Sequence, residues 1–243
     1  HAWIVSFPIG KTEAVKALGN RALPRRRPAL CQRCGDQWMM DPGVPGTDDY
    51  LAEICAEVAR KYDVDGIHLD YIRYPEKSIA FNDNATFKKY GKGLSAAQKA
   101  QWRRDNVTRC VRKITAKVKA VRPWIKMSCA PIGKHADLRR YSAMGWSAMA
   151  MGQEAQRWLG EGLMDWLFPM MYFDGNHFYP FAADWQEHTP GGAAVVPGLG
   201  IWFLDSRERN WPLTDITRQL AVCRALGLGG AAFFRAKFLD NNV

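Results

Sequence analysis

The chain lacks several features that would place it outside the class of globular proteins. Its 243 residues contain no run of about 18 or more apolar residues, so the sequence encodes no membrane-spanning helix. There is no low-complexity tract, no Gly/Ser linker and no self-similar period of about 20–50 residues, which excludes a solenoid. With 47% hydrophobic and 24% charged residues, the composition is that of an ordinary domain with a buried core.

Metal and redox motifs are also scarce. Cys31 and Cys34 form one C-x-x-C motif, but a structural zinc site needs four ligands, and no second C-x-x-C or histidine pair follows at a suitable spacing. A thioredoxin-like context for a redox role is missing. We therefore expect either a local disulfide or two free thiols here. The remaining cysteines fall in apolar patterns and are predicted to lie in the core: Cys55, Cys110, Cys129 and Cys223.

The chain has a marked excess of positive charge. Its formal net charge is +10 and its isoelectric point is about 9.4, with basic residues concentrated in Arg25–Arg27 and along residues 103–122. A nucleic-acid-binding protein would need a basic face and a recognisable binding module, and the sequence contains no such module. We interpret the basic series as a solvated helix face. An acidic polysaccharide substrate is an alternative, because positive walls attract anionic chains.

Apolar runs alternate with helical periods along the sequence. Six strands are predicted, over residues 1–7, 66–71, 125–131, 165–172, 194–201 and 230–234. Helices are predicted over about 48–62, 95–121, 153–159 and 214–226, the first capped by Asp48 or Asp49 and the last by Thr214. The segments from residue 8 to about 47 and from 75 to about 93 are predicted to be long loops.

This alternation predicts a parallel sheet in an α/β protein. The chain opens directly on a strand-like segment without an initiator methionine, and six strands leave two to complete the eight of a TIM-type barrel. We therefore predict a (β/α)8 barrel missing its first two strands, with residues 1–243 forming one catalytic-type domain that holds strands three to eight. The alternative is an open doubly wound sheet, which usually carries a Gly-rich phosphate loop after its first strand. None is visible.

The carboxyl ends of the predicted strands mark the expected site, because active sites of (β/α)8 barrels lie at that face. Asp70 ends the second predicted strand, and strand alternation puts it on the inward face together with His68. A carboxylate is costly to bury there unless it is paired or used in function, and Arg73 is an obvious partner. The structural alternative is an Asp–Arg pair that only ties down the loop.

The stretch Asp65-Gly66-Ile67-His68-Leu69-Asp70-Tyr71-Ile72-Arg73-Tyr74-Pro75 resembles the signature of the bacterial glycoside-hydrolase-like family GHL10. Weaker matches follow the family's order, at residues 1–3, 102–107 and 169–172, where Pro-Met-Met-Tyr stands in place of the more usual Pro-Gln-x-Tyr. The resemblance implies a glycoside-hydrolase-like barrel from an exported bacterial protein. It also implies a location outside the cytoplasm (periplasmic, cell-surface or secreted) and a membrane link only through a lipid anchor outside this chain.

Glycoside hydrolysis needs two carboxyl groups that flank the scissile bond. We predict Asp70 as the nucleophile or base. Asp174 is predicted as the acid, because aromatic neighbours would desolvate it and raise its pKa, although Asp174-Gly175 is also a good turn pair. Three further carboxylates are held in reserve: Glu76, Asp205 and Asp41.

Side chains near the strand ends are predicted to bind a carbohydrate, and no cofactor is expected. The rings of Tyr74, Tyr172 and Trp202 are expected to stack on sugar faces, whereas Trp3 is expected to pack in the core. The interior His68 has an ordinary alternative as a hydrogen-bonded core histidine. The predicted substrate-binding set is His68, Arg73, Tyr74, Tyr172, Asn176, His177, Trp202 and Arg235.

Two other function classes compete with a glycosidase. The first is a barrel that binds glycan without cleaving it, which lacks a second carboxylate at about 5–10 Å from Asp70, the span of the two glycosidase geometries. The second is a metal-dependent hydrolase that uses His68, Asp70 and either His135 or His177. No H-x-H or H-E-x-x-H motif is present, so the sequence predicts no metal site. Nucleic acid is not an expected partner.

Overall fold

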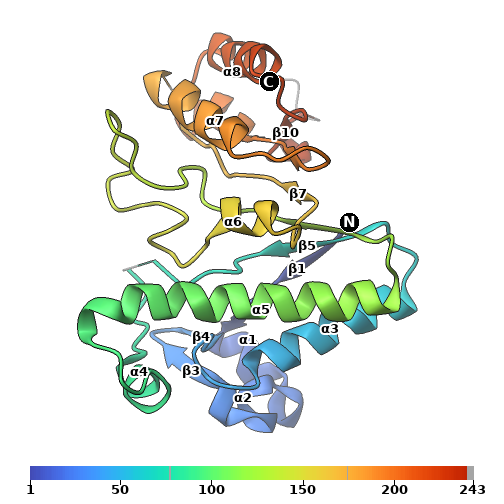
Figure 1. Ribbon diagram of the computed structural model, residues 1–243, viewed down its shortest axis with the longest axis vertical. Coiled ribbons are helices and arrows are strands. Elements are labelled where there is room, and N and C mark those ends of the chain that lie inside the picture. The colour runs from blue at the N-terminus through green and yellow to red at the C-terminus, as the bar shows by residue number, and fades with distance from the viewer. Residues whose placement is uncertain (77, 174, 240–243) are drawn as a thin grey trace. The chain divides into compact units, whose positions relative to one another are not determined.

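The computed structural model describes residues 1–76, 78–173 and 175–239, and its chain divides into two units by internal contacts (Figure 1). The first unit contains His1–Met127 and Met151–Gln153. The second contains Ser128–Ala150 and the chain from Glu154 onward. That one domain covers the whole chain stays a prediction.

Parallel strands form the base of the first unit. They are β1 (Ala2–Val5), β5 (Gly66–Asp70) and the start of β6 (Lys126–Cys129). β1 and β5 pair in parallel with Val5 opposite Asp70, so both strands end at the same edge. The Lys126 N–H donates to the Asp65 carbonyl over 2.8 Å and attaches the start of β6 beside β5. These three predicted strands are confirmed.

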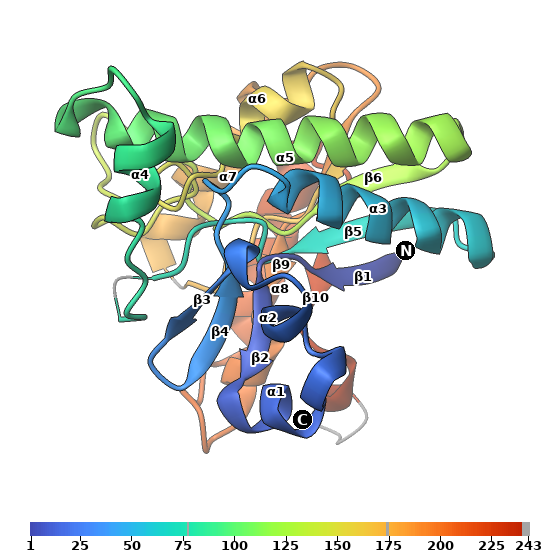
Figure 2. The ribbon, with the colours of Figure 1, turned by 90° about the horizontal axis from the view of Figure 1, so that it is seen from below.

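Two helices cover these strands. They are α3 (Thr47–Lys61) and α5 (Lys99–Val121), which follows the short η3 (Ala96–Gln98). Figure 2 shows α3 and α5 side by side with β5 and β1 on one flank of the pair. Their apolar residues recur at helical spacing and are fully buried, as at Cys55, Ile114 and Val118. Burial of each such aliphatic side chain contributes about 1.5–3 kcal/mol. Both helices are confirmed.

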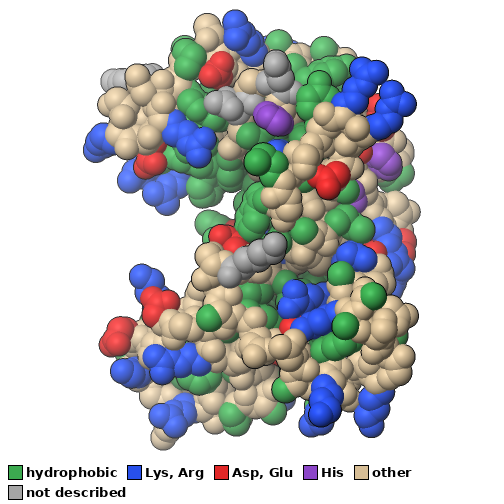
Figure 3. All heavy atoms as spheres, turned by 90° about the vertical axis from the view of Figure 1, so that its left-hand side faces the viewer, with side chains coloured by type: hydrophobic (Ala, Val, Ile, Leu, Met, Phe, Trp, Pro, Cys, Tyr) green, Lys and Arg blue, Asp and Glu red, His purple; other side chains and the backbone are tan. Residues whose placement is uncertain are grey.

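Ion pairs join the exposed edges of α3 and α5. Lys113 contacts Asp48 at 3.0 Å and Asp49 at 2.8 Å, and Lys117 pairs with Glu53. In Figure 3 the Lys and Arg side chains of the visible face stand in small groups with Asp and Glu among them. This arrangement agrees with the interpretation of the basic series as a solvated helix face. Within the described ranges, no helix combines the length and the apolar character needed to cross a membrane.

The predicted caps of two helices are wrong. α3 begins after Gly46, whose φ of +94° suits a residue without a side chain, so Asp48 and Asp49 lie inside the first turn. There they favour the helix through its dipole and not as caps. The helix predicted to begin after Thr214 begins after Pro212 instead. Proline fixes φ near the helical value, so the chain enters the helix two residues early.

The segment from residue 8 to 47 is not the long loop that the sequence predicted. It folds as a three-stranded antiparallel sheet in the order β2-β4-β3, with short helices beside it (Figure 2). Its Pro, Gly and Arg content suggested a loop, because strands of only four residues depend on their partners more than on their own propensity. The elements are β2 (Pro8–Lys11), α1 (Thr12–Ala17), η1 (Gly19–Arg21), α2 (Leu23–Arg26), η2 (Pro28–Leu30), β3 (Cys31–Cys34) and β4 (Gln37–Met40).

The second predicted loop also contains a helix, α4 (Asn84–Tyr90). Its position depends on Asp83, whose side chain is buried and lies just before the helix. Arg103 donates from Nε and Nη2 to the two Asp83 oxygens over 2.7 and 2.8 Å, and Lys99 lies 2.7 Å from the same carboxylate. The Phe87 ring packs edge-on to Trp102 at 5.1 Å. These contacts come from α5 and could not be seen in the segment itself.

Short parallel strands also build the second unit. They are the end of β6, β7 (Trp166–Leu167), β8 (Ala194–Val195), β9 (Gly198–Leu199) and β10 (Ala232–Phe233). β7 pairs with β6 on one side and with β8 on the other, and β10 pairs with β9. The single strand predicted over residues 194–201 is therefore two short strands. Pro197 stands between them and has no N–H to donate to a neighbour.

Three helices accompany these strands: α6 (Ala155–Gly160), α7 (Phe178–Glu187) and α8 (Leu213–Ala225). α6 and α8 were predicted, whereas α7 was missed, and it lies beside α8 (Figure 1). Phe178, Phe181 and Trp185 form its buried side. The remaining short turns are η4 (Gly175–His177), η5 (Ile201–Leu204) and η6 (Ala236–Phe238).

All six cysteines are free, which decides between the two states left open for the C-x-x-C pair. Cys31 is half-buried and Cys34 is buried. Burial raises the pKa of both thiols to about 11, so neither is a thiolate at neutral pH. The other four cysteines lie in the core as predicted.

We expect Asp83→Ala to destabilise the first unit. Burial alone would raise the pKa of Asp83, but hydrogen bonds and positive charge from Arg103 and Lys99 lower it overall. The carboxylate therefore stabilises the fold above its unfolded pKa, and this contribution is lost as the pH falls through the lowered folded value. We expect a loss of about 2 kcal/mol at pH 7, less than for a fully buried pair because the two cations are partly hydrated.

Urea unfolding at pH 7 and at pH 3 measures this effect. The matched control is Asp105→Ala, which removes an exposed carboxylate of α5 and should cost less than about 0.5 kcal/mol. Equal losses in the two variants would contradict a structural role for Asp83.

Candidate active site

Asp70 lies at the carboxyl end of β5 and is only 8% exposed. Its Oδ1 accepts the backbone N–H of Tyr71 over 2.7 Å, and its Oδ2 accepts the indole N–H of Trp3 over 3.1 Å. The parallel register explains the second contact, because Trp3 on β1 stands opposite His68, two residues before Asp70. Each carboxylate oxygen therefore has a fixed donor.

The environment of Asp70 raises the pKa of its carboxyl group. Burial is the main cause, and the Tyr71 N–H, the Trp3 indole and the charge of Arg73 oppose it. Burial disfavours the charged form, while donors aimed at the oxygens favour it. A carboxyl group in this balance is suited to exchange a proton or to attack an electron-poor carbon, since its charge is not screened by water.

Trp3 is not the core residue that the sequence predicted. Its side chain is 61% exposed and its indole N–H reaches Asp70. Exposure alternates along β1, with Trp3 and Val5 on the exposed side, so the strand is covered on one face only. An apolar run of this length suggested burial on both faces, and the alternation could not be read from residues that are all apolar.

The loop after β5 begins with two residues that lie against each other. Tyr71 has a φ of +51°, which turns the chain sharply at the strand end. The Arg73 guanidinium lies 4.8 Å from the centre of the Tyr71 ring, and burial lowers the pKa of Arg73. Arg73 is therefore close enough to act on the charge of Asp70, as predicted, and it is also stacked on an aromatic ring.

A cavity of about 280 Å³ opens at the carboxyl ends of β1 and β5. Tyr71, Arg73 and the reserve carboxylate Glu76 contribute polar groups to its wall, and Gln37 and Met39 close it from β4. The sequence analysis did not identify these last two residues, because their segment was predicted to be a loop. Their arrival at the cavity follows from the antiparallel sheet and has no signal in the local sequence.

His68 and Tyr74 flank Asp70 in the sequence and differ in outcome. Burial, followed by the positive charge of the chain's amino group, lowers the pKa of His68 to about 4, so its imidazole is neutral at pH 7. Tyr74 is only 2% exposed, its N–H donates to the Met151 carbonyl, and its hydroxyl accepts from Asn106 over 3.4 Å. The prediction of an exposed sugar-stacking ring at Tyr74 is wrong, because these contacts hold it in the core.

In the second unit, three partly exposed aromatic rings meet where strands end. The Tyr172 ring lies 4.6 Å from Trp202 and 5.7 Å from Phe234, and Trp202 and Phe234 are 5.5 Å apart. Tyr172 and Trp202 were assigned to sugar stacking, and their exposure is compatible with it. Phe234 was missed, since a phenylalanine at the end of an apolar strand is most often a core residue.

Lys134 is a second residue of this unit that the sequence analysis missed. It follows the carboxyl end of β6, and its Nζ lies 5.1 Å from the Phe181 ring and 5.4 Å from the Phe173 ring. Burial lowers its pKa. The adjoining Gly133 carbonyl accepts the indole N–H of Trp185 over 2.7 Å, which fixes the backbone at this strand end.

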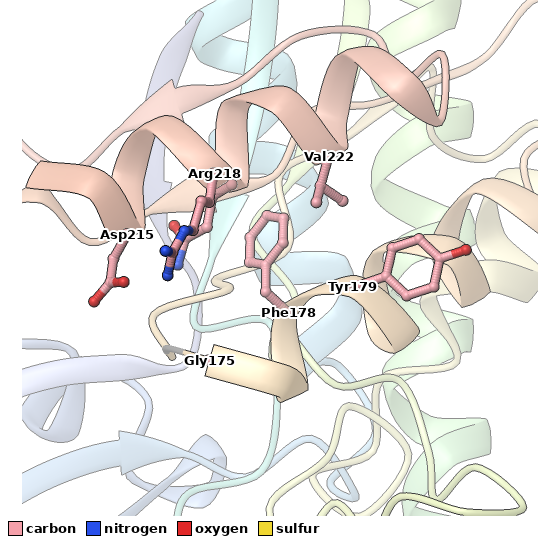
Figure 4. Close-up of a pocket in the computed structure, with 7 residues that line it drawn as sticks. Gly175, Phe178, Tyr179, Asp215, Arg218 and Val222 are labelled. Atoms are coloured by element: carbon pink, nitrogen blue, oxygen red, sulfur yellow. The ribbon is translucent and has the colours of Figure 1, made fainter.

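A smaller cavity of about 150 Å³ lies between α7 and α8. Figure 4 shows Phe178 and Tyr179 on α7 and the side chains of Asp215 and Arg218 on α8. Gly175 of η4 borders the same cavity. Its mixed aromatic and charged wall is compatible with a polar ligand.

The remaining predicted site residues of the second unit are scattered in their surroundings. His177 is exposed, with its ring 6.4 Å from Tyr141, and Arg235 is exposed and lies 6.0 Å from the Phe238 ring. Asp174, the predicted acid, lies outside the described residues, as does the side chain of Asn176. Their roles stay predictions.

Two of the reserve carboxylates are engaged elsewhere. Hydrogen bonds from Arg207 lower the pKa of Asp205 to about 2, so this group is ionised near neutral pH and is a poor general acid. Burial raises the pKa of Asp41, which accepts hydrogen bonds from Thr86, Gln32 and the Gly43 N–H and so ties three segments together. Among the residues that the structure describes, no three His, Cys, Asp or Glu side chains are grouped to hold a metal ion.

Comparison with known families assigns the chain. The model of the family described as glycosyl hydrolase-like 10 (GHL10) matches residues 22–194, which is well over half of the sequence. The chain belongs to the GHL10 family. The stretch around Asp70 that resembled this family's signature lies inside the matched range, so the resemblance is confirmed.

Among curated relatives, this GHL10 chain is similar to glycosyl hydrolase DigH of Escherichia coli strain K12. The two are 32% identical over 226 residues, which cover 85% of this chain and 51% of the relative. The chain thus spans about half the length of the curated relative it matches.

Solved structures show the fold of this GHL10 chain. The glycoside hydrolase domain of PgaB (BpsB) from Bordetella bronchiseptica matches with a TM-score of 0.55 and 14% identity, covering 86% of this chain and 63% of that domain. Bee venom hyaluronidase, solved with a hyaluronic acid tetramer, matches with a TM-score of 0.56 and 11% identity, covering 96% and 77%. The fold is that of a partial (β/α)8 barrel, as predicted.

We expect Trp3→Phe to raise the pKa of Asp70 further. The substitution keeps an aromatic ring but removes the indole N–H that favours the charged carboxylate. Carbon-13 NMR titration of the aspartate carboxyl carbons measures the shift. The control is Trp124→Phe, at a tryptophan that is 70% exposed, which should leave the Asp70 titration unchanged. An unchanged or lower pKa in Trp3→Phe would show that the indole does not stabilise the carboxylate.

Proposed function

We propose that this protein is a glycoside hydrolase that cleaves a poly- or oligosaccharide, with Asp70 as its nucleophile or general base. The observation that carries the proposal is the state of Asp70, a buried carboxyl group at a strand end with a donor on each oxygen. It lies beside a cavity at the face where (β/α)8 barrels carry their active sites. Membership of a glycosyl hydrolase-like family supports this reading.

The reaction needs a second carboxyl group to protonate the leaving oxygen. We propose Asp174 for this role, on its position after a strand among aromatic residues. Glu76 is the described carboxylate in the wall of the 280 Å³ cavity, and it is the substitute if Asp174 is dispensable. Asp70 and either acid would act in turn, one on the anomeric carbon and the other on the departing oxygen.

The substrate is a carbohydrate that we propose to be acidic. The formal charge of +10 supports this, as does the buried guanidinium of Arg73 in the cavity wall. The rings of Tyr172, Trp202 and Phe234 would stack on sugar faces. We also propose that the protein works outside the cytoplasm, where polysaccharides of this kind are reached.

We expect Asp70→Asn to abolish hydrolysis by the full-length protein of any substrate found in a panel of neutral and acidic polysaccharides. Loss of a general base lowers the rate about 100-fold to 10,000-fold, and loss of a nucleophile lowers it at least as far. Asp63→Asn, at a fully exposed carboxylate after α3, should keep full activity. For a nucleophile, Asp70→Ala with added azide should form a glycosyl azide.

Aryl glycosides with good leaving groups separate the two carboxylate roles. Variants of the acid, Asp174→Asn or Glu76→Gln, should lose much less activity on these substrates, because the leaving oxygen no longer needs a proton. Sugar binding without cleavage by the wild-type protein would make the barrel a binding module and would remove the catalytic role of Asp70.

Trp202→Ala should weaken substrate binding about tenfold, which appears as a higher KM at similar kcat. The substitution removes one of the three meeting rings while leaving every carboxylate in place. The comparison variant is Trp124→Ala, at an exposed tryptophan of the first unit. A fall in kcat with unchanged KM would count against a stacking role for Trp202.

A further inference from the structure

The first unit contains a second cavity, of about 420 Å³, within the segment that the sequence predicted to be a loop. It is enclosed by α1, α2, β3 and β4, which lie together in Figure 2. None of its described lining residues belongs to the 280 Å³ cavity near Asp70. Its volume falls in the range of about 300–1,000 Å³ that is typical of small-molecule sites.

The charged groups of this cavity are all positive. Lys16 from α1, Arg25 from α2 and Arg33 from β3 line it, and no Asp or Glu stands among its described lining residues. The segment from residue 8 to 46 contains seven Lys or Arg against three Asp or Glu, so the local field has the same sign. The ion pair of Lys16 with Glu13 is 3.7 Å long and exposed, and such a pair does little to neutralise the lysine.

Two neutral groups complete the wall. The Trp38 ring on β4 is half-buried and offers a flat apolar surface beside the cations. The Thr12 Oγ1 is buried and has no hydrogen-bond partner among the described residues. A buried hydroxyl without a partner is uncommon, and a ligand oxygen or a water in the cavity would satisfy it. The Arg33 Nε donates to the Gly35 carbonyl over 3.0 Å, which holds its guanidinium at the hairpin end.

We propose that this cavity binds a phosphate ester carried by a polyol of about the size of one sugar. Three cationic side chains without a carboxylate suit a doubly charged group, and guanidinium groups bind phosphate oxygens with paired hydrogen bonds. The cavity is several times larger than a phosphate group alone, and the Trp38 ring would pack against the attached polyol. Soluble sugar phosphates and the headgroup of an anionic phospholipid share this chemistry.

Titration calorimetry of the full-length protein with glucose 6-phosphate tests the proposal. We expect binding to glucose 6-phosphate, weaker binding to inorganic phosphate and none to glucose. Arg25→Gln and Arg33→Gln should each weaken binding about tenfold, and Arg25→Lys, which keeps the charge, should weaken it less. The matched control is Arg26→Gln, which removes an equal charge from the same helix at a residue that does not line the cavity.

Sedimentation with phosphatidylglycerol vesicles, against phosphatidylcholine vesicles, distinguishes the lipid source. Binding to phosphatidylglycerol alone that is lost in Arg25→Gln and kept in Arg26→Gln would support the site with a lipid headgroup as its ligand. Equal losses in Arg25→Gln and Arg26→Gln would overturn it, because general charge attraction would then explain binding. Failure of both probes to bind wild-type protein would also overturn it. Thermal unfolding shows that each variant is folded.

Discussion

The parallel pairing of β1 with β5 is the contact on which the candidate site depends. It joins segments about sixty residues apart in the chain and sets Val5 beside Asp70, so that two loops leave the sheet at one edge. The same register brings the Trp3 indole to the Asp70 carboxylate and opens the nearby cavity between the following loops. A slip by one residue would turn Asp70 toward the helices, where no donor of this kind awaits it.

Burial has opposite consequences for different carboxylates of this chain, depending on the donors beside each. Asp70 has only neutral hydrogen-bond donors on its oxygens, and burial prevails, so its pKa is raised. Asp83 is bound by two cations and its pKa is lowered, although it too is buried. The exposed Asp205 needs only Arg207 to reach a pKa of about 2. Charged partners produce structural carboxylates, and neutral donors leave a carboxyl group that can still take part in proton transfer.

The sequence predicted those parts of the fold whose signal is carried within one segment. β1, β5, α3 and α5 have long apolar periods and were found. The antiparallel sheet of residues 8–46 and the helix α4 were missed, because four-residue strands and a single short helix take their stability from partners elsewhere in the chain. The fold class followed from strand and helix alternation together with family resemblance.

Residue type was a poorer guide to exposure than to chemistry. Asp70 was identified from its position at a strand end, yet Trp3 and Tyr74 exchanged the places predicted for them. An aromatic ring can be covered or exposed depending on the neighbouring helix and loop, and the sequence does not show these neighbours. Phe234 and Lys134 were missed for the same reason, since their roles depend on rings and strand ends contributed by other segments.

The small antiparallel sheet has a consequence for how such a protein can diversify. It is built almost wholly from residues 8–46, yet it supplies Gln37 and Met39 to the cavity beside Asp70. A change in this sheet can therefore alter which ligand fits while the strand that carries Asp70 keeps its own hydrogen bonds. Chemistry and selectivity are encoded in separate stretches of the gene, and descent can reshape one without rewriting the other.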